Sequence, residues 1–180
     1  PPLFPPMDTL QLIRQQALQL LSRREYSQRE LQQKLAADHP ADAIETVLAQ
    51  LVEQGLQSDT RFAEVWTRHR LNQGYGPIRI QTELRQKGVA ADTIQAQLSS
   101  DTIDWFARAQ ATWQRKFRGR REREPRLKAK QIRFLQYRGF TSEQIRHALE
   151  APLTDAVESP ELPDFSDDGD FEVADLDQPD

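Results

Sequence analysis

The stretch that decides the fold is Leu84-Arg85-Gln86-Lys87-Gly88-Val89, which continues to Ile94 and Leu98. Shifted by 51 residues, it matches Leu135-Gln136-Tyr137-Arg138-Gly139-Phe140, which continues to Ile145 and Leu149. A first copy, one residue shorter in its turn, has Leu35, Ile44 and Leu48 at the corresponding positions. A pattern that recurs at a period of about 50 residues indicates tandem repeats of one supersecondary unit.

Each copy is predicted to fold as three helices. Apolar residues recur at helical spacing in the first copy, as in Ile13, Ala17 and Leu20. The segments Ser27-x-x-Glu30 and Thr141-x-x-Gln144 are capping boxes that open helices, and Pro77 suits the first turn of another. Because β-type alternation is absent from the sequence, we expect an all-α fold of three tandem three-helix, helix-turn-helix-like repeats.

The turn and charge signals divide the chain into five segments. The three repeats are predicted at residues 8–56, 57–100 and 101–151, and the third contains a basic insertion from Arg118 to Glu124. Residues 1–7 are Pro-rich and are expected to form a flexible arm. Residues 152–180 are predicted to be a disordered acidic tail. The sequence leaves open whether the natural chain starts at Met7.

The composition favours thin helical cores and argues against several classes of protein. Hydrophobic residues make up 37% of the chain and charged residues 29%, which suits small units better than one thick core. With no cysteine, the chain has no disulfide framework and no thiolate chemistry. No apolar run approaches the ~20 residues of a membrane-spanning helix, and a signal peptide is not recognisable. We therefore expect a cytoplasmic monomer without membrane association.

The net charge of −4 conceals an asymmetry. Residues 151–180 contain eleven of the 28 acidic residues and no basic one, so residues 1–150 carry 24 basic residues against 17 acidic ones. A basic body with an acidic end is typical of a protein that meets polyanions. A tail that only improves solubility is the alternative.

Signatures of enzymes and metal sites are lacking in the sequence. Gly74-x-Gly76 has neither the third glycine nor the preceding strand of a dinucleotide-binding motif. His39, His69 and His147 occupy unrelated positions in separate copies, which argues against zinc. Asp167-Asp168-x-Asp170 lacks the closing glutamate of a calcium loop. We expect no catalytic residue, no metal and no cofactor.

The basic residues concentrate in the third repeat. Residues 108–138 hold twelve arginines and lysines against two glutamates. On a helix, one face would carry Arg126, Lys130, Arg133 and Tyr137. The equivalent positions are Tyr75, Arg79, Thr82 and Gln86 in the second repeat, and Tyr26, Glu30, Gln33 and Ala37 in the first. The same outer surface is thus predicted to grow more basic from the first repeat to the third.

This graded face and the insertion give the candidate polyanion-binding residues. They are Arg79, Arg115, Lys116, Arg118, Arg120, Arg121, Arg123, Arg126, Lys130, Arg133 and Tyr137. An ordinary solvated face is the alternative. Core spacing predicts that Trp66, Phe106, Trp113 and Phe117 are packing residues, which leaves Tyr75 and Tyr137 as candidates for stacking on bases.

Four segments in a fixed order carry a family resemblance. They are Arg23-Arg24-Glu25-Tyr26-Ser27-x-x-Glu30-Leu31, Gly55-Leu56-x-x-Asp59-x-Arg61-Phe62-Ala63, Gly76-Pro77-x-Arg79-Ile80-x-x-Glu83-Leu84-Arg85-Gln86-Lys87-Gly88-Val89 and Arg133-Phe134-Leu135-x-x-Arg138-Gly139-Phe140. Together they resemble the RecX family, bacterial regulators of the RecA recombinase, across roughly residues 10–150. The acidic tail and the Pro-rich arm are additions to the family pattern.

The resemblance implies a fold and a function. The repeats would form an elongated crescent that lies in the groove of the RecA filament on single-stranded or duplex DNA. The protein would be a negative modulator that lowers the ATPase, strand-exchange and co-protease activities of RecA, and so tempers recombination, DNA repair and the SOS response. Weak direct contact with DNA is also implied. A stand-alone nucleic-acid-binding protein and a helical scaffold are the competing hypotheses.

The repeat organisation predicts the dimensions of the body, because tandem repeats contact only their neighbours. A compact 150-residue globule would have a radius of gyration of about 15 Å. Small-angle X-ray scattering of a variant lacking residues 152–180 should give a clearly larger value. A radius near that of the globule would contradict the tandem arrangement.

Overall fold

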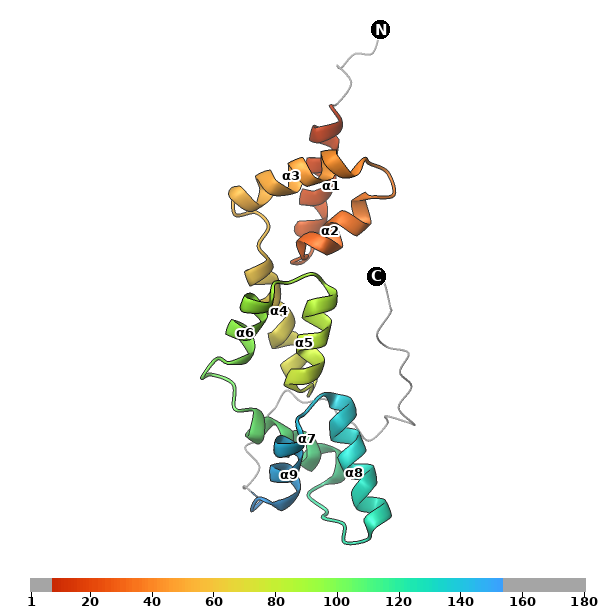
Figure 1. Cartoon of the computed structure of the whole chain (residues 1–180), viewed down its shortest axis with the longest axis vertical. Helices are drawn as coiled ribbons and strands as arrows, with labels where there is room; N and C mark the ends of the chain where they lie inside the picture. Colours follow the sequence, from red (N-terminus) through yellow and green to blue (C-terminus); the bar gives the residue numbers. More distant parts are fainter. Residues whose placement is uncertain (1–7, 154–180) are drawn as a thin grey trace. The chain divides into compact units, whose positions relative to one another are not determined.

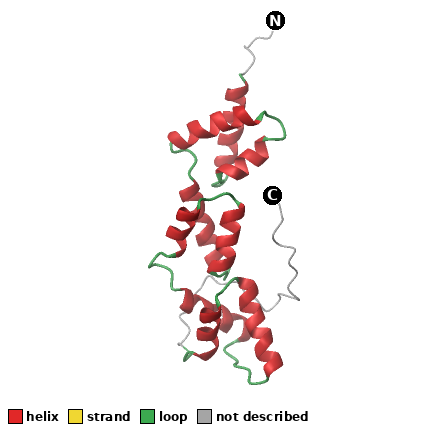
Figure 2. Cartoon of the chain, viewed as in Figure 1, coloured by secondary structure: helices red, strands yellow, loops and turns green. Residues whose placement is uncertain are grey.

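The structure, a computed structural model, describes residues 8–153, and within this range every regular element is a helix (Figures 1 and 2). The arm predicted at residues 1–7 and the predicted tail beyond Leu153 lie outside the described residues. The helices are α1 (Thr9–Leu21), α2 (Gln28–Leu35), α3 (Ala41–Glu53), α4 (Asp59–Asn72), α5 (Pro77–Gln86), α6 (Ala91–Leu98), α7 (Trp105–Phe117), α8 (Pro125–Arg138) and α9 (Ser142–Glu150). The all-α prediction is confirmed.

The helix ends follow the predicted local signals. Ser27 accepts the backbone N–H of Glu30 at 3.1 Å, and the Glu30 carboxylate accepts that of Ser27 at 3.0 Å, which closes the capping box of α2. Thr141 and Gln144 make the same reciprocal pair at the start of α9. Pro77 is the first residue of α5, where its missing N–H costs no helical hydrogen bond.

The described residues pack as two units. Unit 1 comprises residues 8–71 and 77–103, and unit 2 comprises residues 72–76 and 104–153. The helices α1 to α3 of unit 1 enclose a core that includes Ile13, Leu31, Leu48 and Leu51. In unit 2, α7 to α9 enclose Trp113, Phe134, Leu135, Phe140 and Ile145.

The short segment at residues 72–76 belongs to unit 2 because its backbone packs directly on the turn after α8. The N–H of Gly76 donates to the carbonyl of Arg138 at 2.6 Å. A β-carbon at Gly76 would lie 2.5 Å from the carbonyl carbon of Gly139, so no other residue fits without a shift of the backbone. Close packing therefore explains why the second glycine of the Gly74-x-Gly76 segment, Gly76, is a glycine.

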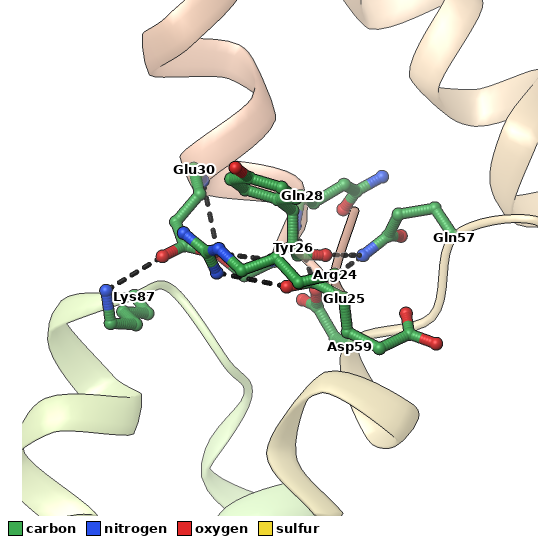
Figure 3. A network of polar contacts seen from close by, with 9 residues as sticks. Arg24, Glu25, Tyr26, Gln28, Glu30, Gln57, Asp59 and Lys87 are labelled. Atoms are coloured by element: carbon green, nitrogen blue, oxygen red, sulfur yellow. Dashed lines mark hydrogen bonds and ion pairs between the residues drawn. The ribbon is translucent and has the colours of Figure 1, made fainter. Parts of the chain in front are cut away.

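Inside unit 1, polar contacts join the α1–α3 repeat to the α4–α6 repeat (Figure 3). Gln57 donates its side-chain amide to the carbonyl of Tyr26 at 3.1 Å, and Asp59 accepts the backbone N–H of Gln28 at 2.9 Å. The carboxylate of Glu30 accepts Lys87 Nζ at 2.8 Å. In each contact one repeat supplies the donor and the other the acceptor. The junction therefore depends on residues of both repeats.

Glu30 is a buried carboxylate in this junction. Its residue surface is only 9% exposed, and burial alone would raise the pKa of the carboxyl. The ion pair with Lys87, the N–H of Ser27 and the guanidinium of Arg24 outweigh that effect and hold the pKa of Glu30 below its usual value of 4.5. Since the carboxyl binds its proton more weakly when folded, it stabilises the fold above pH 4.5, and this contribution is lost as the pH falls through the folded pKa.

We therefore expect Glu30→Gln to lower the free energy of unfolding near pH 7 by ~1–3 kcal/mol, because a hydrogen-bonded charged partner of Lys87 is removed. Urea unfolding at a series of pH values should show that the difference in free energy of unfolding between wild type and variant becomes smaller as the pH falls below 4.5. The matched control is Glu45→Gln, since Glu45 is exposed on α3. A gap for Glu30→Gln that is unchanged below pH 4 would contradict this role.

Candidate polyanion-binding surface

The basic insertion forms the loop between α7 and α8, and a buried amide anchors it. Gln131 on α8 is 3% exposed. Its Oε1 accepts the indole N–H of Trp113 at 2.9 Å, and its Nε2 donates to the carbonyl of Arg120 at 2.9 Å. The loop backbone is thus tied to the centre of the unit 2 core.

The end of α7 turns sharply into this loop. Arg118 closes the helix in the left-handed region with φ 54°, and Gly119 follows with φ 71°. Phe117 meets Phe134 edge to face with ring centroids 5.4 Å apart, and Lys116 Nζ lies 5.5 Å from the Phe134 centroid. Aromatic packing therefore fixes the base from which the loop cations project.

An open hollow of about 390 Å³ lies beside the loop. It is lined by Lys116, Phe117, Arg118, Arg120, Glu122 and Gln131. Three cations face one carboxylate there, so the hollow favours an anionic group over a cationic one.

The predicted face of α8 is exposed along its length. Arg126, Lys130, Arg133 and Tyr137 are all exposed, and Tyr137 retains 51% of its surface. The opposite side of the helix buries Gln131, Phe134 and Leu135. α8 therefore presents three cations and one aromatic ring on one side, next to a loop that carries more cations.

The remaining candidate residues differ in their surroundings. Arg115 and Arg123 are exposed. Arg121 donates to the carbonyl of Ala151 and places its guanidinium 5.9 Å from the Trp113 ring centroid. Arg79 lies in unit 1 and is not part of the unit 2 group.

Arg79 belongs to a separate cluster around a buried carboxylate. Its Nε lies 3.2 Å from Glu83 Oε1, and Glu83 is 4% exposed. Glu83 Oε2 also accepts Trp66 Nε1 and Arg70 Nε, each at 2.9 Å. Sequence reasoning placed Arg79 on an outer face, whereas the structure gives its guanidinium a structural partner.

Several sequence-based expectations are corrected here. The graded outer face is wrong in the first repeat, because Tyr26 and Glu30 are buried. Phe106 was expected in the core but is 43% exposed, and it meets His147 edge to face. Tyr75 was expected to be an exposed stacking residue but is half-buried, with the Arg138 guanidinium 4.7 Å from its ring centroid.

Three models of one protein family match the chain. The first three-helix domain of RecX matches residues 14–51, the second matches residues 58–98 and the third matches residues 102–149. These matches cover most of the chain in the order in which the domains occur.

The chain belongs to the RecX family.

Curated relatives agree with this assignment. A regulatory protein RecX from Pseudomonas entomophila is 44% identical over 144 residues, which cover 79% of this chain and 93% of the relative. The regulatory protein RecX from Vibrio cholerae is 46% identical over 143 residues and is covered to 94%. The chain is thus similar to these regulatory proteins over nearly their whole length.

Solved RecX structures have a similar fold. The crystal structure of RecX from Lactobacillus salivarius matches with a TM-score of 0.66 at 22% identity, covering 77% of this chain and 93% of that one. A second crystal structure of a regulatory protein RecX matches with a TM-score of 0.64 at 27% identity, covering 77% and 70%. The RecX three-helix repeats are therefore the shared architecture.

None of the helices between residues 8 and 153 is long and apolar enough to cross a membrane. In the same range, no three His, Asp or Glu side chains gather in a way that could hold a metal ion.

The anchoring role of Gln131 leads to a prediction about the basic loop. Replacing Gln131 with Leu leaves the Trp113 indole and the Arg120 carbonyl without their buried partner, which should lower the free energy of unfolding by ~1–3 kcal/mol. Native-state hydrogen exchange should show that residues 118–124 exchange faster in the variant than in the wild type, with a smaller change in α7 and α8.

The control is Gln136→Leu, which changes an exposed residue of the same helix. It should leave both the stability and the loop exchange close to wild type. Equal exchange of the loop in wild type and Gln131→Leu would show that the amide does not hold it.

Proposed function

We propose that the protein is a non-enzymatic negative modulator of RecA that binds in the groove of the RecA–DNA filament. Binding as a monomer in the cytoplasm, it lowers the ATPase, strand-exchange and co-protease activities of RecA. It thereby tempers recombination, DNA repair and the SOS response. Family membership supports the regulatory role, and the basic surface of unit 2 is the observation that carries the proposed mode of binding.

The chemistry of that surface suits a DNA-coating filament. A filament on DNA offers regularly spaced phosphates within a protein groove, and cations that neutralise phosphates release counterions. Arg126, Lys130 and Arg133 project from one face of α8, and the loop adds Arg118 and Arg120 at an anchored backbone. Because the anchoring residues are buried, little ordering of the loop remains to be done on binding.

Weak direct contact with DNA belongs to the same proposal. Phosphate contacts position a protein without reading sequence, and cations on α8 and its loop suit that role. Tyr137 is the exposed aromatic ring on the α8 face and could stack on an unpaired base. We therefore expect binding that is salt-dependent and indifferent to base sequence.

The regulatory role is tested with RecA ATPase on single-stranded DNA. The protein at substoichiometric amounts should lower the steady-state rate of ATP hydrolysis. If ATP hydrolysis is unchanged at saturating protein, modulation of RecA is not the function.

The binding surface is tested with Arg126→Glu, Lys130→Glu and Arg133→Glu combined. This variant should bind RecA filaments and single-stranded DNA more weakly. Each lost phosphate contact should also reduce the slope of log affinity against log salt by about 0.7 on single strands. Fluorescence anisotropy with a labelled oligonucleotide at several salt concentrations measures both quantities.

The matched control makes the same change of charge in unit 1, with Arg23→Glu, Arg68→Glu and Arg85→Glu. All three of these arginines are exposed. The control should retain most of the affinity and the salt slope. Equal losses in both triple variants would contradict the assignment of the surface to α8.

A further inference from the structure

Hydrogen bonds and packing hold the last described residues beside the basic loop. Gln110, which is 4% exposed, donates its side-chain amide to the carbonyl of Pro152 at 3.0 Å. Arg121 of the loop donates to the carbonyl of Ala151. A β-carbon at Gly119 would lie 3.8 Å from Leu153 Cδ2, so Leu153 lies against the turn that opens the loop.

These contacts fix where the following segment begins. Leu153 lies beside Gly119, whose sequence neighbours Arg118 and Arg120 line the hollow. An extended chain spans about 3.3–3.6 Å per residue, so a few residues beyond Leu153 suffice to reach either side chain.

The segment that starts there has the opposite charge. Residues 154–180 contain eleven acidic residues and no basic one. Phe165 and Phe171 stand among the acids, so apolar contact could add to the electrostatic attraction. Its opposite charge and its start next to Leu153, beside the basic loop, together indicate this segment as an occupant of the basic surface.

We propose that residues 154–180 dock in cis on the loop hollow and the neighbouring α8 face, and compete there with nucleic-acid phosphates. Docking would restrain binding to other polyanions until a strong one, such as a filament on DNA, displaces the segment. The docking itself stands on the unit 2 contacts, whereas its effect on filament binding rests on the proposed function.

The expected size of the restraint follows from tethering. A tethered segment has an effective concentration in the millimolar range. If the segment binds the surface with a Kd of about 0.1–1 mM, it lowers the affinity of a competing ligand about two- to tenfold. The effect should fade at high salt, since the Debye length falls from about 10 Å at 0.1 M to about 3 Å at 1 M.

Docking is tested first without DNA or RecA. Zero-length carbodiimide cross-linking of the full chain, read by mass spectrometry, should join carboxylates of residues 154–180 to Lys116, Lys128 and Lys130. The links should be strong at 0.1 M salt and weak at 1 M. An equal mixture of isotopically light and heavy protein distinguishes links within one chain from links between chains.

Competition is tested with Asp167→Asn, Asp168→Asn and Asp170→Asn combined in the full chain. Affinity for a labelled oligothymidylate should rise about two- to fourfold at 0.1 M salt, with little change at 1 M. The matched control replaces Asp42, Glu45 and Glu53 with their amides, which makes the same change of net charge at exposed positions in unit 1. It should raise the affinity clearly less.

Each outcome decides the proposal. Cross-links to Lys34 of unit 1 as frequent as those to Lys116 and Lys130 would overturn it, and so would links found mainly between chains. Equal effects of the two triple variants would reduce the segment to a source of net charge. If the cross-links form as expected but RecA ATPase is unaffected by the protein, the docking stands and the proposed function fails.

Discussion

The side-chain amide of Gln131, which is 3% exposed, bonds to the buried indole of Trp113 on one side and to the carbonyl of Arg120 at the edge of the unit 2 core on the other. Breaking either hydrogen bond would leave a buried polar group without a partner, so the amide keeps both. The same two bonds connect α7, the loop and α8. The positions of the loop cations therefore depend on an uncharged side chain, which holds the loop by its backbone.

The two units use their basic residues in different ways. Unit 1 turns Lys87 toward Glu30, and Arg70 and Arg79 toward Glu83, so that buried carboxylates hold cations inside the fold. Such pairs stabilise a particular packing at the cost of desolvating both charges. In unit 2, Arg126, Lys130 and Arg133 are exposed along one face. The cations named in unit 1 are thus structural partners of buried carboxylates, whereas the three on α8 belong to the candidate binding surface.

Local signals in the sequence predicted most of the fold, and long-range contacts account for what it missed. Capping boxes and the proline at α5 depend on residues a few positions apart, so they can be read directly, and the exposed α8 face follows from helical spacing. The burial of Glu30 depends on Lys87, 57 residues away, which periodicity cannot reveal. Gln131 gave only a weak signal, as a polar residue on the apolar side of α8.

The most direct test of the central claim is an electron cryomicroscopy reconstruction of RecA filaments on single-stranded DNA saturated with the full-length protein. The account predicts that α8 and the loop at residues 118–124 face into the filament groove, with Arg126, Lys130 and Arg133 near DNA phosphates or acidic RecA side chains. A reconstruction in which this surface faces solvent while another part of the protein makes the contact would contradict it.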